Sequence, residues 1–598
     1  MQIQPAIFQS INKQKQTLLN FSNISSSNII HGITTHFSLK SNFAAINKPA
    51  TACLSSQPQQ QDRPLANFPA TVWGDCFSSL NFNDSKFEWY EKQVKVLKEN
   101  IMVMVCDSAC DSVEKIVLID SLCRLGVSYH FEDAIEEELD RIFNAQLHIF
   151  ENDYDLYTIS LAFRVLRQHG FKMSTDVFNK FKDTNGNFRS SLLNDAKGLL
   201  SLFEATHLSL PGEDILDEAF DFSKEFLQSS AIESFPDLKN HITNALEQPF
   251  HNGIPRLEAR KFIDLYQNDS SRNDTLLEFA KLDFNRVQLV HQQELNQYSM
   301  MWKELNLTSE IPYARDRMAE IYFWASSTYF EPQYAHSRLI IARVVLLISL
   351  VDDTIDAYAT IDEIHQLAEA IERWDISCLD ELPDYLKRFY TLLLSTFSDF
   401  ENELKDQGKS YSVKFGKEAY QELVRGYYLE AKWFSEGKVP TFDEYLYNGS
   451  MTTGLPLVST VGFMGLEKVK GTKEFDWLKT YPKLSYISGA FIRLVNDLTS
   501  HKTEQARGHV ASSIDCYMKQ HGGTKEEAVK VLEKMARDCW KEMNEEMMRP
   551  TEFSVDMLMR IVNLVRLTDV SYKYGDGYTD SQQLKGFVKG LFVDPIPL

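Results

Sequence analysis

The chain has 598 residues, of which 43% are apolar and 24% are charged. This is the composition of a folded globular protein, and the length exceeds what one hydrophobic core usually supports. The net charge of -22 excludes a general nucleic-acid binder, because phosphate backbones are bound by basic surfaces. The longest apolar run, from Leu339 to Val351, includes Arg343 and is too short for a membrane span of about 20 residues.

The first 61 residues differ in composition from the rest of the chain. They contain four lysines, no acidic residue and many serine, threonine, asparagine and glutamine residues. Acid-poor, hydroxyl-rich leaders are typical of organelle transit peptides, and the absence of arginine favours a plastid over a mitochondrion. We expect residues 1–61 to be a plastid transit peptide and the mature protein to reside in the chloroplast stroma. A disordered tail that is not removed is the alternative.

Beyond residue 62 the apolar residues recur at helical spacing. In the stretch 133–143 one apolar face is formed by Ile135, Leu139, Ile142 and Phe143. Farther along, Thr524 and Glu527 have the spacing of a capping box, and the apolar stripe that follows consists of Ala528, Leu532, Met535 and Cys539. We find neither hairpin signals nor an alternation of strands with helices. The fold class is therefore predicted to be all-α.

The most polar interruption of the helical pattern is the segment NDSSRND, from Asn268 to Asp274. Such clusters of polar residues mark loops between helices. We place a domain boundary there and expect two helical domains, one over residues 62–270 and one over residues 271–598. Both sizes are ordinary for domains. The first domain contains no motif that indicates chemistry, so the active site is expected in the second.

Two arginines, Arg315 and Arg317, occur close together in the segment IPYARDRMAE, and Arg493 lies much later in the chain. Guanidinium groups bind phosphate oxygens through pairs of parallel hydrogen bonds. Taken singly, each arginine is equally compatible with a surface salt bridge. Which of these two roles the arginines have depends on the other residues that lie near them.

Three carboxylates follow the apolar run, in the sequence DDTID. At 3.6 residues per turn, Asp352 and Asp356 lie on one helix face, and Asp353 is rotated away by about 100°. Two buried like charges one turn apart raise each other's pKa unless a cation binds them, and hard oxygen ligands favour Mg2+. The alternative is a solvated acidic helix end.

A second oxygen-rich face follows the apolar stretch 484–495, in the sequence NDLTSHKTE. Its residues at intervals of four are Asn496, Ser500 and Glu504, whose amide, hydroxyl and carboxylate oxygens suit Mg2+. Asp497 points elsewhere. Alone, this pattern is also that of an ordinary polar helix face. Two such faces together with the arginines predict a site that binds a diphosphate within an otherwise acidic protein.

The combination of motifs resembles that of the plant class I terpene synthases. The resemblance rests on DDTID, NDLTSHKTE, RDR and, at residues 63–73, RPLANFPATVW, and it extends over residues 63–598. It implies an N-terminal α-barrel without catalytic residues, a C-terminal class I terpenoid synthase α-bundle, and a monomer. The stretches CRLGVSYHFE, YNGSMTTGLPLVST and YKYGDGYTDSQQLKGFVKGLFVDPI are similar to those of family members that cyclise geranylgeranyl diphosphate to a macrocyclic diterpene in plastids.

Carried over by motif position, the resemblance assigns roles to individual residues. Asp352 and Asp356 are expected on one side of a cluster of three Mg2+ ions, for which Mn2+ can substitute. The ligands expected on the other side are Asn496, Ser500 and Glu504. The departing diphosphate is expected to be held by Arg315, Arg317 and Arg493. Trp324 and Tyr578 match aromatic residues of the family's pocket, where π faces stabilise a carbocation; for Trp324 a place in the helical core is the alternative.

Several alternatives share part of this evidence. Another macrocyclic product such as neocembrene, or farnesyl diphosphate as substrate, is compatible with every motif named above. A chain-elongating prenyl diphosphate synthase would have two aspartate-rich clusters. A non-enzymatic helical scaffold would explain the helices but not two oxygen-rich faces with arginines. The Arg63-Pro64 pair, where many monoterpene synthases have tandem arginines, disfavours that class, and no DxDD motif of class II cyclases is present.

Overall fold

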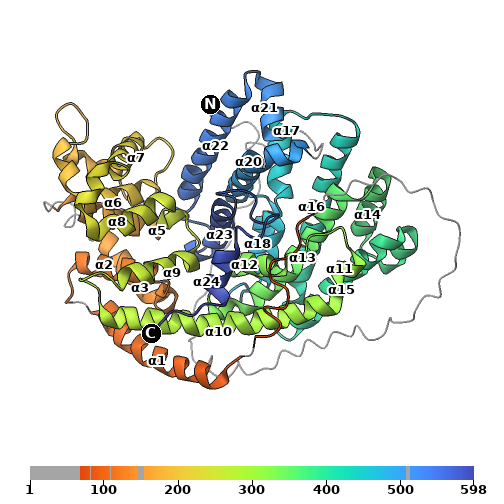
Figure 1. Cartoon of the computed structure of the whole chain (residues 1–598), viewed down its shortest axis with the longest axis horizontal. Coiled ribbons are helices and arrows are strands. Elements are labelled where there is room, and N and C mark those ends of the chain that lie inside the picture. Colours follow the sequence, from red (N-terminus) through yellow and green to blue (C-terminus); the bar gives the residue numbers. More distant parts are fainter. Residues whose placement is uncertain (1–67, 81, 108, 145–153, 507–511) are drawn as a thin grey trace, which may run out of the picture. The chain divides into compact units, whose positions relative to one another are not determined.

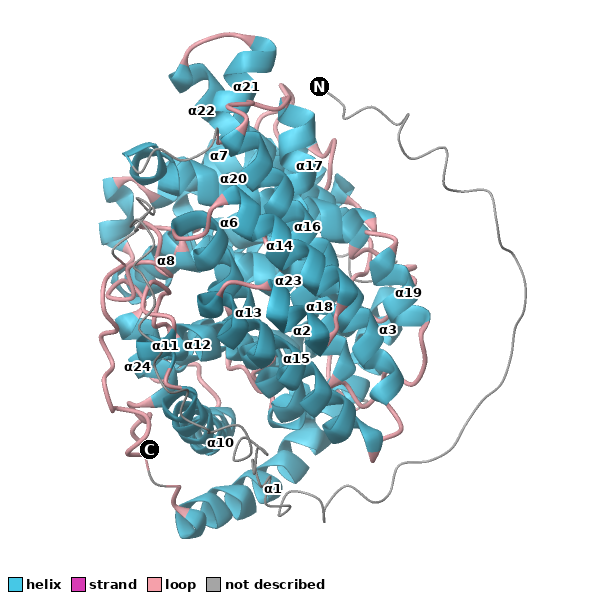
Figure 2. Cartoon of the chain, turned by 90° about the vertical axis from the view of Figure 1, so that its right-hand side faces the viewer, coloured by secondary structure: helices cyan, strands magenta, loops and turns pink. Residues whose placement is uncertain are grey.

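The computed structural model describes residues 68–80, 82–107, 109–144, 154–506 and 512–598, and of residues 230 and 501–506 it describes the main chain only. The predicted leader, residues 1–61, lies outside these ranges. Within them the regular structure is helical (Figures 1 and 2), apart from one isolated bridge between Lys182 and Phe188. The prediction of an all-α fold is confirmed.

The first part of the chain forms a group of short helices whose apolar faces pack together. The predicted helix around residues 133–143 is α3, and three of its four predicted face residues are buried. In α6 nearly every residue is buried, because α5, α7 and α8 pack around it. The helices of this part are α1 (Asp84–Cys106), α2 (Ser112–Arg124), α3 (Glu132–Asn144), α5 (Leu156–Gln168), α6 (Ala196–Thr206), α7 (Asp214–Leu227), α8 (Pro236–Glu247) and α9 (Pro255–Tyr266).

The long helix α10 (Asp274–Leu305) begins where the predicted boundary segment ends. The Asn273 side chain accepts hydrogen bonds from the main-chain N–H groups of Thr275 and Leu276, which satisfies donors that the start of a helix leaves unpaired. α10 contacts α1 and α9 of the first part, and also α12 (Met318–Thr328) and α24 (Lys585–Phe592) of the second. The residues from Arg63 to Leu598 group into one compact unit, so the division into two domains stays a prediction.

The second part is a bundle of longer helices. α13 packs among α12, α15, α16 and α18, and α20 packs against α17, α22 and α23. Thr524 and Glu527 form the predicted capping box at the start of α22. The remaining helices are α11 (Leu307–Glu310), α13 (Ala335–Ala357), α14 (Ile361–Arg373), α15 (Asp384–Lys405), α16 (Val413–Ser435), α17 (Phe442–Thr452), α18 (Leu455–Met464), α19 (Lys473–Lys479), α20 (Lys483–Ala506), α21 (Ser513–His521), α22 (Lys525–Glu546) and α23 (Val555–Ser571).

α13 contains the longest apolar run of the chain and is buried on most sides. Its one central charge, Arg343, donates two hydrogen bonds to the carboxylate of Glu403, at 2.8 and 2.6 Å. Neither α13 nor any other described helix combines the length and the apolar character that a membrane span requires. The apolar run instead anchors the helix in the bundle, so that its carboxyl-terminal end holds the three aspartates in a defined place.

The residues that precede α1 lie against helices of the second part. This segment, residues 68–80, is called the N-terminal strip below. The Trp73 indole Nε1 donates a buried hydrogen bond of 2.7 Å to Oε1 of Glu320 on α12. The Asn296 amide on α10 donates to three main-chain carbonyl oxygens of the strip, those of Phe77, Ser78 and Leu80. The strip is therefore attached to both α10 and α12.

Candidate active site

The three aspartates at the end of α13 differ in their surroundings. Asp352 is half-buried, Asp353 is buried, and Asp356 is exposed. Asp353 accepts a hydrogen bond of 2.7 Å from the main-chain N–H of Arg315. Burial raises the pKa of Asp353, although the charge of Arg315 opposes the shift. Asp353 is thus engaged with the chain segment before α12, as expected for a residue that does not share the face of Asp352 and Asp356.

Arg315 joins this segment to the aspartates. Its Nη2 lies 2.7 Å from Oδ2 of Asp352, and its Nε lies 2.7 Å from Oδ1 of Asp353. Burial alone would lower the pKa of Arg315, but the charges of Asp353 and Asp352 raise it well above its ordinary value. The guanidinium also stacks against two aromatic rings, with its central carbon 4.9 Å from the ring centre of Phe68 and 4.8 Å from that of Tyr578.

The predicted second face lies on α20. Asn496 is half-buried and Ser500 is buried, and the Ser500 hydroxyl donates to the Asn496 carbonyl oxygen at 2.8 Å. Asp497 is directed elsewhere, because its carboxylate accepts hydrogen bonds of 2.8 Å from the Tyr445 hydroxyl and the main-chain N–H of Ser513. The main chain of Glu504 belongs to α20, but its side chain lies outside the part of the chain that the structure describes.

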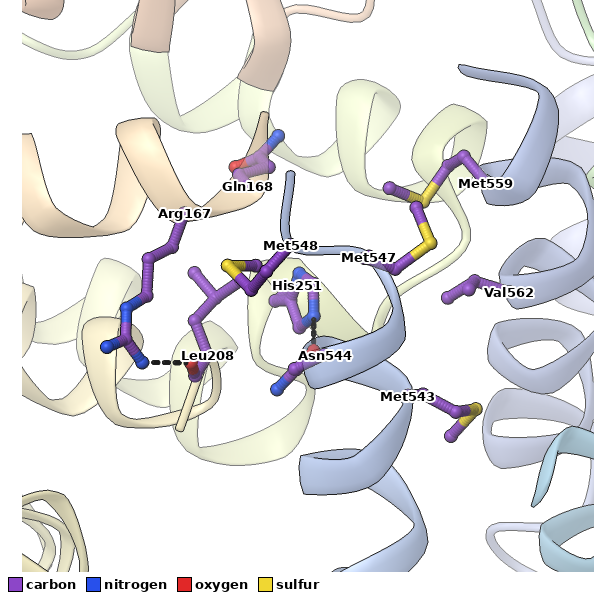
Figure 3. Close-up of a pocket in the computed structure, with 10 residues that line it drawn as sticks. All are labelled: Arg167, Gln168, Leu208, His251, Met543, Asn544, Met547, Met548, Met559 and Val562. Carbon is purple, nitrogen blue, oxygen red and sulfur yellow. Dashed lines mark hydrogen bonds between the residues drawn. The ribbon is translucent and has the colours of Figure 1, made fainter. Parts of the chain in front are cut away.

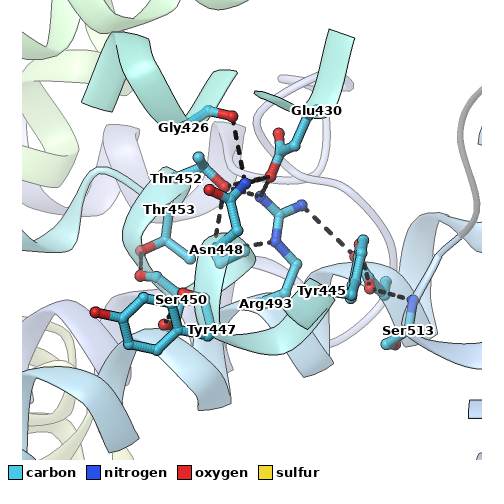
Figure 4. A network of polar contacts seen from close by, with 12 residues as sticks. Gly426, Glu430, Tyr445, Tyr447, Asn448, Ser450, Thr452, Thr453, Arg493 and Ser513 are labelled. Carbon is cyan, nitrogen blue, oxygen red and sulfur yellow. Dashed lines mark hydrogen bonds and ion pairs between the residues drawn. The ribbon is translucent and has the colours of Figure 1, made fainter. Parts of the chain in front are cut away.

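Arg493 lies one turn before Asn496 and is held by α16 and α17 (Figure 4). Its Nε donates to the Gly449 carbonyl oxygen at 3.2 Å, and its Nη2 donates to the Thr452 hydroxyl at 2.9 Å. The same Nη2 lies 3.9 Å from Oε1 of Glu430. Glu430 in turn accepts hydrogen bonds from the Asn448 amide at 3.0 Å and from the Thr452 hydroxyl at 2.7 Å. A half-buried carboxylate on α16 therefore lies close to the predicted diphosphate-binding arginine of α20.

Two residues of α16 interact electrostatically both with the aspartates of α13 and with Arg493 of α20. Burial raises the pKa of Glu430; the charge of Arg493 lowers it and that of Asp352 raises it further. Burial also raises the pKa of Tyr427 well above its ordinary value, with further upward contributions from Asp352, Glu430 and Asp356. Since Coulomb interactions fall off with distance and with screening, these couplings place the end of α13 and the Arg493 region of α20 around the same stretch of α16.

Sequence reasoning did not identify Tyr427 and Glu430. They lie within an amphipathic helix, about 75 residues after the aspartates, without a recognisable motif. One signal was present: Tyr420, Tyr427 and Glu430 are spaced as members of one helix face, and the first two are buried. A carboxylate placed on the apolar face of a helix is costly unless it is paired, and it marks a candidate functional residue.

Arg317 is placed differently from Arg315, although both were assigned to the diphosphate. It is completely buried. Its hydrogen bonds run to main-chain carbonyl oxygens, namely Tyr578 at 2.8 Å, Asp316 at 2.8 Å, Pro69 at 2.9 Å and Thr579 at 2.7 Å. These contacts tie the N-terminal strip to the segment that follows α23.

The two predicted aromatic residues lie side by side. The ring centres of Trp324 and Tyr578 are 4.6 Å apart. The Tyr578 hydroxyl donates a buried hydrogen bond of 2.6 Å to the hydroxyl of Ser349 on α13, and burial raises the pKa of Tyr578. Tyr578 is therefore a neutral phenol whose ring contacts both Trp324 and Arg315.

A separate small pocket lies where α22 and α23 meet the first part of the chain (Figure 3). His251 is hydrogen-bonded to Asn544 there at 2.8 Å, and Arg167 donates to the Leu208 carbonyl oxygen at 3.0 Å. Burial lowers the pKa of His251 to about 3, so its ring is neutral. None of the residues that line this pocket is among the predicted site residues.

The donor set of the site fits a hard divalent cation. It combines the carboxylates of Asp352 and Asp356 with the amide of Asn496 and the hydroxyl of Ser500, all of which offer oxygen atoms. Among the described residues no group of three or more His, Cys, Asp or Glu side chains is arranged to hold a metal ion. The predicted ligands lie on two helices and include neutral groups.

Comparisons with known proteins agree with this geometry. Residues 303–542 match the metal-binding domain of the terpene synthase family, and residues 72–246 match the family's N-terminal domain. The chain is 70% identical to the chloroplastic casbene synthase of Ricinus communis over 563 residues, which are 94% of this chain and 93% of that protein. It is 48% identical to a probable terpene synthase 6 of the same plant over 549 residues, 90% of this chain and 99% of the relative.

Solved structures of terpene synthases are also similar to this chain. Isoprene synthase from grey poplar leaves (Populus x canescens), in complex with three Mg2+ ions and dimethylallyl-S-thiolodiphosphate, matches with a TM-score of 0.79 and 32% identity, over 86% of this chain and 99% of that one. Limonene synthase with 2-fluorolinalyl diphosphate matches with a TM-score of 0.82 and 31% identity, over 90% and 100%. The chain belongs to the terpene synthase family and contains its metal-binding domain.

Proposed function

We propose that this protein is a Mg2+-dependent class I diterpene synthase that cyclises geranylgeranyl diphosphate to casbene and releases diphosphate. The observation that carries the proposal is the 70% identity to a casbene synthase over nearly the whole of both chains. The geometry of the site supports it, because Asp352 and Asp356 of α13 and Arg493 of α20 interact with the same stretch of α16.

We propose that Asp352 and Asp356 bind metal ions on one side of the diphosphate, and that the ligands on the other side are Asn496, Ser500 and Glu504. Three Mg2+ ions are proposed, with Mn2+ as a possible substitute; a structural relative holds three Mg2+ ions together with a diphosphate analogue. Bound Mg2+ supplies the positive charge that stabilises the departing diphosphate. Asp352 already pairs with Arg315, so the carboxylate and the arginine are positioned together before substrate binds.

The chain's own cations complete the diphosphate site. Arg315 approaches it from the aspartate side and Arg493 from α20, and each can donate hydrogen bonds to phosphate oxygens. Glu430 keeps Arg493 oriented, because it shares Thr452 with that arginine as a hydrogen-bond partner. As the bond between C1 and oxygen breaks, both electrons pass to the diphosphate, and groups already in place neutralise its charge.

The allylic cation that remains needs a site from which water is excluded. The adjacent rings of Trp324 and Tyr578 offer π faces to such a cation, and the raised pKa of Tyr578 keeps its phenol from acting as an anionic nucleophile. Attack of the distal double bond on C1 then closes a fourteen-membered ring. Loss of a proton with closure of a cyclopropane ring yields casbene.

We further propose that residues 1–61 direct the protein to plastids, that residues 62–270 have no catalytic role, and that residues 271–598 form the catalytic domain of a monomer. The acid-free leader and the chloroplastic relative support the plastid location. The position of every assigned site residue after residue 310 supports the placement of the catalytic domain.

One experiment tests the proposed function. The protein is incubated with Mg2+ and with C10, C15 or C20 prenyl diphosphate separately, and the hydrocarbons are identified by mass spectrometry against standards. Casbene from the C20 substrate is expected. Neocembrene would change the product but keep the substrate class, whereas a hydrocarbon from the C15 substrate alone would replace the diterpene assignment with that of a sesquiterpene synthase. No product from any substrate would contradict the enzymatic proposal.

A further inference from the structure

Arg317 has almost no capacity left for a ligand in this structure. A guanidinium group has five N–H donors, and Arg317 directs hydrogen bonds to four main-chain carbonyl oxygens while it is completely buried. Arg315, two residues earlier, differs because its partners are the carboxylates of Asp352 and Asp353 and a hydroxyl, that of Thr579 at 3.3 Å.

The segments that Arg317 connects are far apart in the sequence. Its Nη2 donates both to Pro69 in the N-terminal strip and to Thr579 after α23, and its Nε donates to Tyr578. The planar guanidinium fork is suited to this task, because it offers several donors in a fixed geometry. Breaking the connection would remove this donor from the main-chain carbonyl groups of Pro69, Tyr578 and Thr579.

The same two segments supply the rings that enclose Arg315. Phe68 immediately precedes Pro69, and its ring centre lies 4.9 Å from the Arg315 guanidinium carbon. Tyr578 contributes a second ring at 4.8 Å. A connection between Pro69 and residues 578–579 therefore determines whether both rings remain in contact with Arg315.

The strip is attached independently farther along. Trp73 is hydrogen-bonded to Glu320 on α12, in the first turn after Arg317. Asn296 on α10 holds the strip's last residues. These attachments leave residues 68–69 at the end of the anchored segment, and Arg317 donates hydrogen bonds to main-chain carbonyl oxygens both of this end and of Tyr578 and Thr579.

We infer that Arg317 is a positioning residue rather than a diphosphate ligand: it joins the N-terminal strip to residues 578–579 and thereby holds Arg315 between Phe68 and Tyr578. This inference rests on the proposed function, because it concerns how that site is closed during ionisation. Phe68, from the first part of the chain, then helps to enclose Arg315 without contacting the reacting atoms. Loosening the connection admits water to the carbocation, so hydroxylated products accumulate.

The first test separates a positioning role from direct binding without using turnover. Calorimetry measures the binding of inorganic pyrophosphate in the presence of Mg2+ to the full chain and to Arg315→Gln, Arg317→Gln and Arg317→Lys. Arg315→Gln is expected to weaken binding by roughly tenfold or more, and both Arg317 variants by less than about threefold. Equal losses in Arg315→Gln and Arg317→Gln, with recovery in Arg317→Lys, would identify Arg317 as a direct ligand and overturn the inference.

Hydrogen exchange followed by mass spectrometry supplies the second test. Arg317→Gln and Arg317→Lys are both expected to increase exchange in peptides that cover residues 68–80 and 572–584, because one ammonium group cannot span two segments. Unchanged exchange in both peptides would contradict the connection. If Arg317→Gln does not fold, Arg317→Lys and Phe68→Ala still decide the question.

The third test measures the share of hydroxylated diterpene among all products. Phe68→Ala and Arg317→Gln should each raise this share several-fold, and the double variant should raise it little further, because both changes release the same contact. Arg566→Gln is the matched control: Arg566 is another buried arginine that donates to a main-chain carbonyl, that of His251 at 2.7 Å, and its loss should lower stability without changing product partition.

Additive effects of the first two changes, or the same partition change in the control, would contradict the inference. A failure of the proposed function would give a different result from a failure of this inference. In that case the unmodified protein makes no diterpene, while the binding and exchange measurements remain interpretable.

Discussion

The ends of α13 and α20 supply the two sides of the site by different electrostatic means. α13 presents two carboxylates, Asp352 and Asp356, and a cation, Arg315, already pairs with the first of them. Among the described side chains of α20, the face offers neutral groups, because its one carboxylate in this region, that of Asp497, is used to hold Tyr445 and Ser513. Under the proposed assignment, Asp352 and Asp356 should contribute more to Mg2+ affinity than Asn496 and Ser500, because carboxylates attract the cation more strongly than neutral oxygen atoms do.

The largest effect is expected on α13. Asp352→Asn removes a negative charge that the metal site and Arg315 share, and kcat/KM should fall by at least about 100-fold. The change is measured by steady-state kinetics at saturating Mg2+. Asp362→Asn on the neighbouring helix α14, which removes an exposed charge, serves as the control and should remain active. Comparable activity of the two variants would exclude Asp352 as a ligand.

A smaller loss is expected on α20. Asn496→Ala and Ser500→Ala should each lower kcat/KM about tenfold and raise the Mg2+ concentration for half-maximal activity, since a neutral ligand contributes less than a carboxylate. Asn496→Asp should lower that Mg2+ concentration, because it adds charge to the weaker side. Ser395→Ala removes a similar intrahelical hydroxyl bond from α15 and should leave the Mg2+ response unchanged. A larger loss of kcat/KM in Ser500→Ala than in Asp352→Asn would contradict the expectation that α13 contributes more to metal binding than these α20 donors.

Glu430 lies between the two sides and links activity to stability. Its pKa is raised in the folded protein by burial, although Arg493 opposes the shift. A raised folded pKa means that its contribution to stability is present below the unfolded value, near 4.5, and is lost as pH rises through the folded pKa. Glu430→Gln should therefore reduce the decline in stability of the metal-free protein as pH rises from about 4.5 to 7, while it lowers turnover about tenfold.

Thermal unfolding at several pH values and steady-state kinetics measure these two effects. A variant that loses activity together with stability at every pH would assign Glu430 a purely structural role. The conservative variant Glu430→Asp keeps the charge but shortens the side chain, so it should retain the pH dependence while losing part of the activity.

The smallest effect on chemistry is expected at Asp497. Asp497→Ala leaves the Tyr445 hydroxyl and the Ser513 N–H without their acceptor, which costs about 1–3 kcal/mol for each buried group. The midpoint of thermal unfolding should fall, while the Mg2+ concentration for half-maximal activity changes less than in Asn496→Ala. A Mg2+ response like that of Asp352→Asn would show that Asp497 belongs to the metal site.

Local pattern was sufficient to predict the helices and the orientation of the three aspartates relative to one another. The apolar run before Asp352 predicts a helix that is buried on most sides, and the spacing of three aspartates predicts which one turns away, as Asp353 does. The capping box at Thr524 is likewise a local arrangement over four residues. Long-range contacts could not be predicted in this way. Glu430 interacts with Arg493 and Asp352, which are far from it in the sequence, and only the folded chain brings them together.

By itself the sequence determined the helical fold class and the residue types that each helix face presents, because helical periodicity depends on neighbours within a few residues. Only the tertiary structure decided which of those groups meet. It brought Asp352 to Arg315, set Glu430 against Arg493, and turned Arg317 toward Pro69 and Tyr578. Such choices depend on which buried polar groups find partners across the folded chain, and two arginines of identical chemistry two residues apart can therefore acquire different roles.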